Sequence, residues 1–598
     1  MRHGISKTDD GTWTFSLYAP NPERVELHVE GGPGTVAMNR GPDGFWRAEV
    51  PGPQAGARYA YVLDGGDKRP DPASHLQEEG VHGPSTLVAH DAFPWTDAGF
   101  VPPPREEWVI YELHVGTFTE EGTFQAAIKR LDYLTALGVT TVEVMPVAAF
   151  PGERNWGYDG VQPFAVQANY GGPEGFKAFV DAAHARGLAV VLDVVYNHLG
   201  PEGNYLREFG PYFTDRYQTP WGEAINFDGP GSDGVRAYFL DNLEHWLTRY
   251  HLDGLRLDAV FMIFDERPEH ILAELSRRAA EVGERTGREP VLMAEDCLNR
   301  ASLVRPRDSG GMGMQAMWAD DFHHAVHSLL TGERGGYYID YGALEQVARA
   351  MEDGWAYQGE YSPFRRRAHG EPCGHLPGES FVFCIQNHDQ VGNRALGERL
   401  PSLVSFEACK LAAAALLTAP AVPLLFMGEE FGEDAPFLYF IDHGDKWLLD
   451  AVREGRAEEF ADFFKDKEPP DPAAPETLAA SRIAPEKRLT GRHAAMFAWY
   501  SRLLELRRTH QALRRPDKEH CRFWCFEREG LLAMRRGRPG ERLLCLFNFS
   551  DKPASADPDA FLPGCRVLLD SSNDDFGGTG GEPGLLPPYS ARIHEEQT

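Results

Sequence analysis

The segment Asp253-Gly-Leu-Arg-Leu-Asp258-Ala-Val260 decides the fold of this chain. It is a short apolar run that carries an arginine and ends on a carboxylate, a pattern typical of buried parallel strands that open toward a substrate. Side chains alternate between the two faces of a strand, so Arg256 and Asp258 share one face. A guanidinium so close keeps the carboxylate ionised and oriented, which suits a nucleophile better than a general acid. The segment by itself also fits a structural ion pair at a strand end.

Strand-like and helix-like runs alternate along the chain from Trp108 onward. Helical patterns at 124–137, 176–185 and 235–250 separate short apolar runs. The apolar runs number eight and lie at 109–118, 140–147, 188–195, 253–260, 291–294, 317–318, 381–386 and 422–427. This alternation indicates a parallel sheet, and eight units predict an α/β fold in the form of a (β/α)8 TIM barrel.

Two β-rich segments flank the predicted barrel. Short alternating runs between Thr12 and Leu63, separated by Gly, Pro, Asn and Asp, predict an N-terminal β-sandwich within residues 1–100. The barrel takes residues 101–515, and its long insertion at 200–232 is rich in Gly, Pro and aromatics, as functional loops often are. Alternating runs after a helix at 494–508 predict a small C-terminal β-domain over residues 516–598.

The composition excludes several classes of partner. A net charge of −31 over 598 residues disfavours nucleic acids and anionic membranes, so we expect neither as a partner. The apolar stretch 411–427 contains two prolines and predicts a buried helix followed by a buried strand rather than a membrane span. The first residues lack the apolar core of a secretory signal. The eight cysteines show no metal-ligand spacing, so we expect buried, reduced thiols in a cytoplasmic protein.

Four of the predicted strands end in clusters of polar residues. The clusters are Asp193-Val-Val-Tyr-Asn197-His198, Arg256-Leu-Asp258, Ala294-Glu295-Asp296 and Gln386-Asn387-His388-Asp389. Asp and Asn also cap the helices that follow strands, so each cluster alone has a modest structural explanation. In a barrel all four clusters lie at one face, and there Asp258, Glu295 and Asp389 converge.

Three convergent carboxylates suit glycoside hydrolysis by the retaining route. That route needs a nucleophile and an acid/base about 5–5.5 Å apart, a separation that adjacent strands can supply. Negative charge at Asp258 and Asp389 raises the pKa of an acid at Glu295, which must stay protonated. Side chains able to hydrogen-bond to a sugar or stack on it occur nearby, namely His198, His388 and Tyr158. A phosphate site is the usual rival at this face, but these strand ends carry no Gly-rich loop or Lys cluster.

The four clusters resemble the four signature regions of the α-amylase family, glycoside hydrolase family 13. The resemblance implies that Asp258 is the nucleophile and Glu295 the acid/base, with Asp389 as the third carboxylate that stabilises the transition state. It implies that Arg256 orients the nucleophile. It also implies a set of substrate contacts: His198, His388, Tyr158 and Asp193. The N-terminal sandwich resembles the starch-binding-type module that precedes the barrel in branching and debranching relatives.

Narrower motifs are similar to those of the family members that hydrolyse the α-1,4 bond next to the terminal trehalose of maltooligosyltrehalose and release trehalose. The motifs are Trp318-Ala-Asp-Asp-Phe-His-His324, Gln386-Asn-His-Asp-Gln-Val-Gly-Asn393 and Phe426-Met-Gly-Glu-Glu430. This resemblance implies further substrate contacts from Asp320 and Asp321. Aromatic residues on the surrounding loops are candidates for additional contacts, and they are Trp221, Phe261, Phe264 and Trp318. It implies maltooligosyltrehalose and other α-glucan oligosaccharides as ligands, and maltooligosyltrehalose synthase as a functional partner.

We expect no metal and no cofactor. Asn197 matches a calcium ligand of many amylases, and here we expect it to be a structural hydrogen-bonding residue. Asp296, which follows the predicted acid, fits either a helix cap or a subsite contact.

Two alternatives stay open. A glycogen branching enzyme, which is a transglycosylase, shares the sandwich and the Trp156-Gly-Tyr158 motif, but its fourth region usually carries Ser where this chain has Asn387. A non-catalytic glucan-binding protein built on the same barrel generally lacks one of the catalytic carboxylates, and all three are present here.

Overall fold

A closed barrel of parallel strands forms the centre of the molecule, in a computed structural model that describes residues 1–598 except 9, 33, 461–469, 583 and 598. Within the described residues its eight strands follow one another in chain order, and the last pairs with the first. They are β10 (Ile110–Leu113), β11 (Thr141–Val144), β14 (Ala189–Val194), β17 (Gly254–Leu257), β18 (Val291–Glu295), β19 (Ala316–Trp318), β22 (Phe381–Cys384) and β23 (Val422–Phe426). The predicted (β/α)8 barrel is confirmed.

Small and apolar side chains fill the lower part of the barrel. One buried cluster takes alternate residues from the strands, among them Ile110, Val191, Met293 and Leu424. Gly254 begins β17 where the next strand is close: a Cβ at this position would lie 2.3 Å from the Val291 carbonyl oxygen. Only glycine fits there. The polar residues of the four clusters lie at the opposite, C-terminal ends of the strands.

Helices pack around the barrel and connect its strands. The longer ones are α4 (Gly172–His184), α6 (Ser232–Arg249), α7 (Ile271–Thr286), α8 (Asp320–Thr331), α9 (Leu344–Asp353), α11 (Phe406–Thr418), α12 (Lys446–Glu459) and α14 (Gly491–Thr509). The short ones are α1 (Val115–Phe118), α2 (Phe124–Ile128), α3 (Leu131–Leu137), α5 (Leu206–Phe209), α10 (His388–Gly392), α13 (Pro475–Ala480) and α15 (Gln511–Arg514).

The single helix predicted over 124–137 is two helices, α2 and α3. Lys129 and Arg130 separate them, and α3 ends at Gly138 in the left-handed conformation that glycine favours. The stretch 411–427 is the predicted buried helix and strand, α11 and β23. The insertion after β14 folds into α5 and a hairpin of β15 (Phe213–Thr219) and β16 (Gly222–Ile225). Two other loops contain short strand pairs, β12 (Ala148–Ala149) with β13 (Gln162–Val166) and β20 (Tyr361–Ser362) with β21 (Arg367–Ala368).

The predicted N-terminal sandwich is confirmed as two antiparallel sheets. One sheet contains β1 (Gly4–Lys7), β2 (Thr12–Tyr18), β6 (Phe45–Pro51) and β5 (Asn39–Arg40). The other contains β4 (Gly34–Ala37), β3 (Val25–Val29), β7 (Arg58–Leu63), β8 (Lys68–Arg69) and β9 (Ser85–Thr86). Alternating residues face the core between them, as in β6, where Phe45, Ala48 and Val50 are buried.

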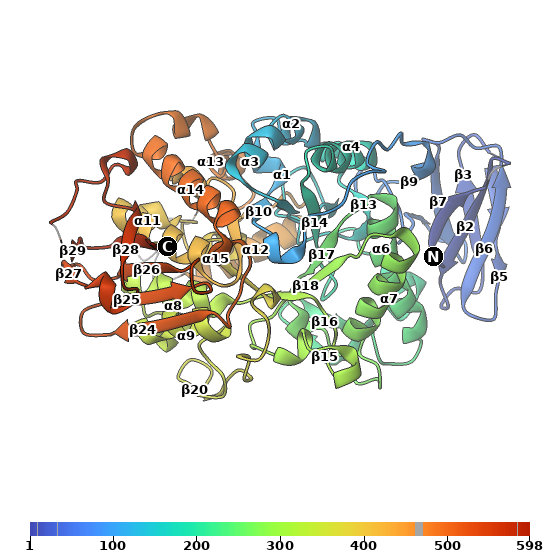
Figure 1. Ribbon diagram of the computed structural model, residues 1–598. Coiled ribbons are helices and arrows are strands. Elements are labelled where there is room, and N and C mark those ends of the chain that lie inside the picture. Colours follow the sequence, from blue (N-terminus) through green and yellow to red (C-terminus); the bar gives the residue numbers. More distant parts are fainter. Residues whose placement is uncertain (9, 33, 461–469, 583, 598) are drawn as a thin grey trace.

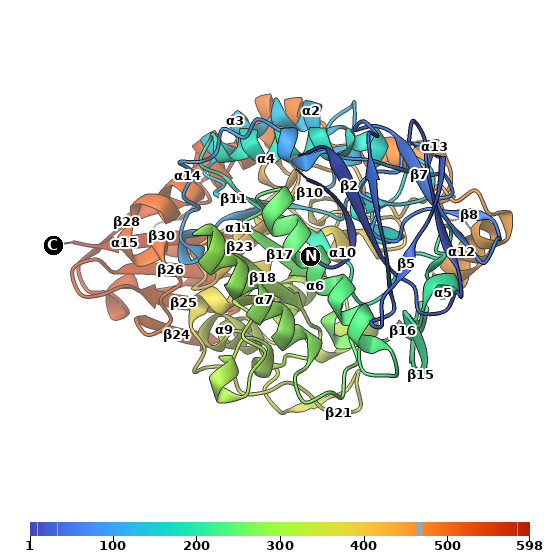
Figure 2. The same cartoon turned by 90° about the vertical axis from the view of Figure 1, so that its right-hand side faces the viewer.

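The C-terminal sheet lies at the opposite end of the molecule from the sandwich (Figure 1). Its strands are β24 (Cys521–Phe526), β25 (Leu531–Arg536), β26 (Leu543–Asn548), β30 (Ser590–Glu596) and β28 (Cys565–Asp570). A short pair, β27 (Ala554–Ser555) and β29 (Leu585–Leu586), lies beside it. Turned by 90°, Figure 2 shows the N-terminus close to α6, and the backbone N–H groups of Arg2 and His3 donate to Asp241 of that helix.

Two sequence expectations concern the environment of the protein. Within the described residues, no helix is long and apolar enough to cross a membrane. All eight cysteines are described and are free thiols, as expected. The expectation that they are buried is wrong for Cys525, which is exposed on the edge strand β24.

Candidate active site

A single guanidinium connects the polar ends of the barrel strands. The side chain of Arg256 is 0% exposed, and its Nη1 donates to Asp193 Oδ1 at 2.9 Å, Asp193 Oδ2 at 2.8 Å and Asp258 Oδ1 at 2.8 Å. Its Nη2 lies 3.5 Å from Glu295 Oε2 and 3.9 Å from Asp389 Oδ2. One buried cation therefore attracts four carboxyl groups that come from four different strands.

Strand register brings Asp258 and Glu295 together. Leu257 pairs with Ala294, so the next residues leave β17 and β18 side by side. Ala259 has a φ of 41°, a left-handed conformation that strains a residue with a side chain. This bend turns the Ala259 N–H toward Glu295 Oε2, to which it donates at 2.5 Å.

Asn197 holds the other oxygen of Asp258. Its Nδ2 donates to Asp258 Oδ2 at 2.7 Å and to the Asp258 carbonyl at 2.8 Å. Its side-chain oxygen lies 2.5 Å from His198 Nδ1, so the atom that would bind calcium in a related amylase already has a protein partner. The position of Asn197 agrees with the structural role expected for it.

The environment of Glu295 favours its protonated form. Burial raises the pKa of Glu295 well above its ordinary value, and the charges of Asp258 and Asp389 raise it further, against the opposing effect of Arg256. Asp320, when it is ionised, also raises the pKa of Glu295. The pKa of Asp320 is itself raised to about 7, first by burial and then by repulsion from Asp389. A carboxyl that keeps its proton near neutral pH can act as a general acid.

Asp389 takes the opposite protonation state because of His388. Although burial opposes charging of both groups, the His388 imidazolium lowers the pKa of Asp389 to about 2, while Asp389 and Glu112 raise the pKa of His388 well above its ordinary value. His388 Nδ1 donates to Glu112 Oε1 at 2.5 Å. Sequence reasoning missed Glu112, which lies within the first predicted strand and has no motif around it to mark it.

Both nitrogens of His388 already have protein partners. The Nε2 donates to the Tyr158 hydroxyl at 2.6 Å, and that hydroxyl donates to Asp193 Oδ2 at 2.6 Å. The Tyr158 ring also stacks on the imidazole, with centroids 5.1 Å apart. Because His388 is 0% exposed and both its nitrogens are bonded, it positions Asp389 and Tyr158, and its contact with sugar hydroxyls stays a prediction.

A cavity of about 740 Å³ opens above these residues. Four of the expected site residues line it, and they are Asp258, Asp389, Tyr158 and His198. Trp221, on the loop between β15 and β16, stacks on the His198 ring with centroids 4.2 Å apart and planes 7° apart. The indole is 50% exposed, so it presents a flat apolar face at the edge of the cavity.

Three other expected substrate contacts have different surroundings. Trp318 is buried beneath Arg256, whose guanidinium carbon lies 4.3 Å from the centroid of the Trp318 ring. The indole therefore forms part of the barrel floor. Asp321 is also buried, and it accepts hydrogen bonds from the Tyr341 hydroxyl and two backbone N–H groups, which makes it a structural residue. Phe264 stacks on Tyr217 of the β15 hairpin. For these three residues direct contact with the substrate stays a prediction.

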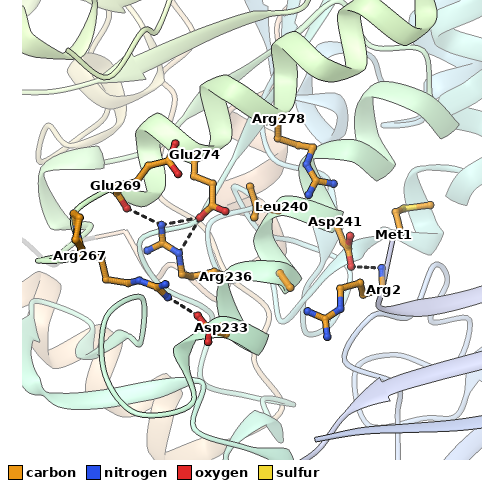
Figure 3. Close-up of a pocket in the computed structure, with 12 residues that line it drawn as sticks. Met1, Arg2, Asp233, Arg236, Leu240, Asp241, Arg267, Glu269, Glu274 and Arg278 are labelled. Atoms are coloured by element: carbon orange, nitrogen blue, oxygen red, sulfur yellow. Dashed lines mark hydrogen bonds and ion pairs between the residues drawn. The ribbon is translucent and has the colours of Figure 1, made fainter. Parts of the chain in front are cut away.

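A second cavity, of about 680 Å³, lies between the N-terminus and helices α6 and α7 (Figure 3). Its charged side chains pair with one another: Arg236 with Glu274, Arg267 with Asp233, and the backbone N–H of Arg2 with Asp241. The bond from Arg2 to Asp241 holds the N-terminus against α6, and the pair of Arg236 with Glu274 joins α6 to α7. The cavity thus lacks the unpaired acid and nucleophile that distinguish the first one.

A (β/α)8 barrel with three carboxyl groups converging at the strand ends defines a glycoside hydrolase of the α-amylase class. Family models agree: residues 92–219 match the alpha amylase catalytic domain, and residues 3–78 match carbohydrate-binding module 48, the isoamylase N-terminal domain. The chain is 49% identical to a malto-oligosyltrehalose trehalohydrolase from Saccharolobus solfataricus over 77% of this chain and 80% of that one. It belongs to the malto-oligosyltrehalose trehalohydrolase family.

Two further comparisons set the range of similarity. A crystal structure assigned to an alpha amylase from Salmonella typhimurium superposes with a TM-score of 0.91 at 41% identity, covering 100% of this chain and 99% of that one. A 1,4-alpha-glucan branching enzyme from Salinibacter ruber is 27% identical over 77% of this chain and 78% of that one. The chain is therefore more similar to the trehalohydrolase than to the branching enzyme.

Replacing Arg256 by Lys tests the central guanidinium. A lysine keeps the charge, but its side chain is shorter and has no second nitrogen to approach Glu295 and Asp389, so we expect kcat to fall roughly 10- to 100-fold, the effect of losing one charge-assisted hydrogen bond. Steady-state kinetics on maltooligosyltrehalose measure it. The control is Arg300→Lys, because Arg300 pairs with the buried carboxylate of Asp296, the residue after Glu295, and contacts none of the catalytic carboxylates. The kcat of this variant should equal that of the wild type. Wild-type kcat in Arg256→Lys would contradict the role of Arg256.

Proposed function

We propose that this chain hydrolyses the α-1,4-glucosidic bond next to the terminal trehalose of maltooligosyltrehalose, with retention of configuration, and releases trehalose. The observation that carries the mechanism is the pair of neighbouring carboxyl groups at the ends of β17 and β18, one bonded to Arg256 and the other protonated through burial. Membership of the trehalohydrolase family carries the choice of substrate.

The first chemical step forms a glycosyl-enzyme ester. Glu295 gives its proton to the glycosidic oxygen, and the C–O bond to trehalose breaks as Asp258 Oδ attacks the anomeric carbon. Bonds from Arg256 and Asn197 fix the plane of the Asp258 carboxylate. Trehalose leaves as a neutral alcohol, and the maltooligosyl group stays on Asp258.

The second step returns the enzyme to its starting state. The Glu295 carboxylate now takes a proton from water, and the resulting hydroxide attacks the anomeric carbon and displaces Asp258. The products of this step are an α-configured maltooligosaccharide and protonated Glu295. Two inversions give net retention, which distinguishes this route from direct attack by water.

The remaining polar groups bind and orient the sugar. Asp389, kept ionised by His388, can accept hydrogen bonds from sugar hydroxyls and stabilise the positive charge of the transition state. The exposed indole face of Trp221 provides a platform on which a glucose ring can stack. Tyr158 lines the same cavity and is held in place by Asp193 and His388.

The proposal extends to the cellular setting of the enzyme. Eight free thiols support a cytoplasmic location. The N-terminal sandwich matches a carbohydrate-binding module, which supports α-glucans as ligands. A substrate with a trehalose end requires an enzyme that makes it, so we propose maltooligosyltrehalose synthase as the functional partner.

A product assay with purified protein tests the substrate. We expect maltotriosyltrehalose to yield trehalose and maltotriose, while maltopentaose, which has the same number of glucose units but no trehalose end, is cleaved much more slowly. Anion-exchange chromatography resolves the products. In Glu295→Gln, which cannot donate the proton, turnover should fall about 10²- to 10⁴-fold, the usual contribution of a general acid, while substrate still binds.

Four outcomes would count against the proposal. Absence of free trehalose would exclude a trehalohydrolase, and new α-1,6 branches on a long glucan would favour the branching enzyme. Wild-type turnover in Glu295→Gln would remove Glu295 from its role. Binding without turnover in the wild-type chain would favour the non-catalytic alternative.

The pH dependence of kcat/KM tests the protonation of Glu295. Activity requires the protonated acid, so it is lost as pH rises through the raised pKa of Glu295. Asp320 contributes to that raised pKa, and Asp320→Asn should therefore move the alkaline limb to lower pH, by up to about one unit. Asp215→Asn, a charge change on the exposed face of β15, is the control and should leave the limb in place. A shift to higher pH in Asp320→Asn would contradict the assignment.

A further inference from the structure

Three buried histidines meet where the sandwich joins the barrel, and none of them lines the proposed catalytic cavity. His75 and His90 come from the connector that leads to and from β9, and His245 comes from α6. Their exposed fractions are 4%, 7% and 0%. One potential ligand atom from each lies within 4.8 Å of those of the other two, and this is the only such group found among the described residues.

We propose that His75, His90 and His245 bind one Zn²⁺, which fixes the connector of residues 71–92 to the barrel. The site is structural and lies outside the proposed catalytic cavity. The proposal does not depend on the trehalose activity, because nothing in the catalytic steps uses these residues.

Distances within the cluster suit a zinc ion. Two nitrogens bound to one tetrahedral zinc lie about 3.4 Å apart, given Zn–N bonds of about 2.0–2.1 Å. His75 Nδ1 and His90 Nε2 are already 3.1 Å apart, so these two can bind the same ion with little movement. The third nitrogen, from His245 on α6, must move inward from its present separation when the ion binds.

The hydrogen bonds of the His245 ring leave a lone pair for a metal. His245 Nε2 donates to the Phe164 carbonyl at 3.1 Å, a common arrangement for a metal-binding imidazole. Its Nδ1 therefore carries a lone pair, and that buried atom has no hydrogen-bond partner in the described part of the chain.

The surroundings of the three rings affect how strongly a metal can bind. The Tyr250 ring packs 5.5 Å from His90 and 5.3 Å from His245, and its buried hydroxyl also lacks a partner among the described residues. Two cations lie near the rings, and each is paired with an acid, Lys177 with Glu174 at 3.6 Å and Arg249 with Asp91 at 2.5 Å, which weakens but does not remove their repulsion of a metal ion. Zinc suits the site because it accepts imidazole ligands and imposes no strict geometry.

Metal analysis of the full-length, tag-free chain tests the proposal. After dialysis with excess Zn²⁺ and removal of free metal, we expect about one zinc per chain by mass spectrometry. His75→Gln and His245→Gln should each weaken zinc binding by more than the roughly 10- to 100-fold that loss of an outer-shell partner costs. His82→Gln, in the same connector but with a 56% exposed side chain, is the matched control and should bind zinc as the wild type does. Added Zn²⁺ should raise Tm only in the wild type and the control.

A second measurement decides the matter if the variants fail to fold. Wild-type protein loaded with Co²⁺ should show the visible absorption of a tetrahedral ion with nitrogen ligands and no sulfur charge-transfer band, which would mark an exposed cysteine such as Cys525. Wild-type protein that retains no zinc and shows no change in Tm would overturn the proposal and leave a buried water among the rings. A thiolate spectrum, or zinc retained equally in His75→Gln and His245→Gln, would overturn it as well.

Discussion

The burial of one guanidinium among four carboxyl groups is the constraint on which the rest of the site depends. Arg256 is removed from water by the barrel wall and by Trp318 beneath it, and an unpaired charge in that position would be strongly destabilising. It must therefore be bonded to Asp193 and Asp258, which fixes the ends of β14 and β17 relative to each other. The fold and the nucleophile are secured by the same bonds.

That constraint also separates the protonation states of the other carboxyl groups. Arg256 bonds directly to Asp258 but only approaches Glu295, so burial and negative neighbours prevail at Glu295 and it keeps its proton. Asp389 is farther from Arg256 and owes its ionised state to His388, whose pKa is raised by Asp389 itself and by Glu112 on β10. Different neighbours within one cluster therefore determine the protonation states of Glu295 and Asp389. This separation allows a single site to catalyse both steps of a retaining mechanism.

Sequence reasoning reached the barrel and the three carboxylates because both follow from local patterns. The periods of strands and helices mark the elements, and polar residues at the ends of parallel strands must share one face. Sequence patterns could not identify residues whose role depends on long-range contacts. Glu112, which bonds to His388, has no motif around it. The bonds of Asp321 to Tyr341 and two backbone N–H groups, and the stacking of Phe264 on Tyr217, join residues that lie apart in the sequence. The three histidines of the zinc proposal come from distant segments, so metal-ligand spacing in the sequence could not reveal them.

The central claim is that Asp258 forms a covalent bond to the sugar while Arg256 holds it. Trapping that bond tests the claim most directly: Glu295→Gln, which cannot activate water for the second step, is treated with a maltosyl fluoride whose good leaving group needs no acid. Proteolysis and tandem mass spectrometry then locate the added sugar. We expect an ester on Asp258 and none in the variant that also carries Asp258→Asn. A sugar attached to a different residue, or complete turnover to a β-configured product with no ester formed, would contradict the account.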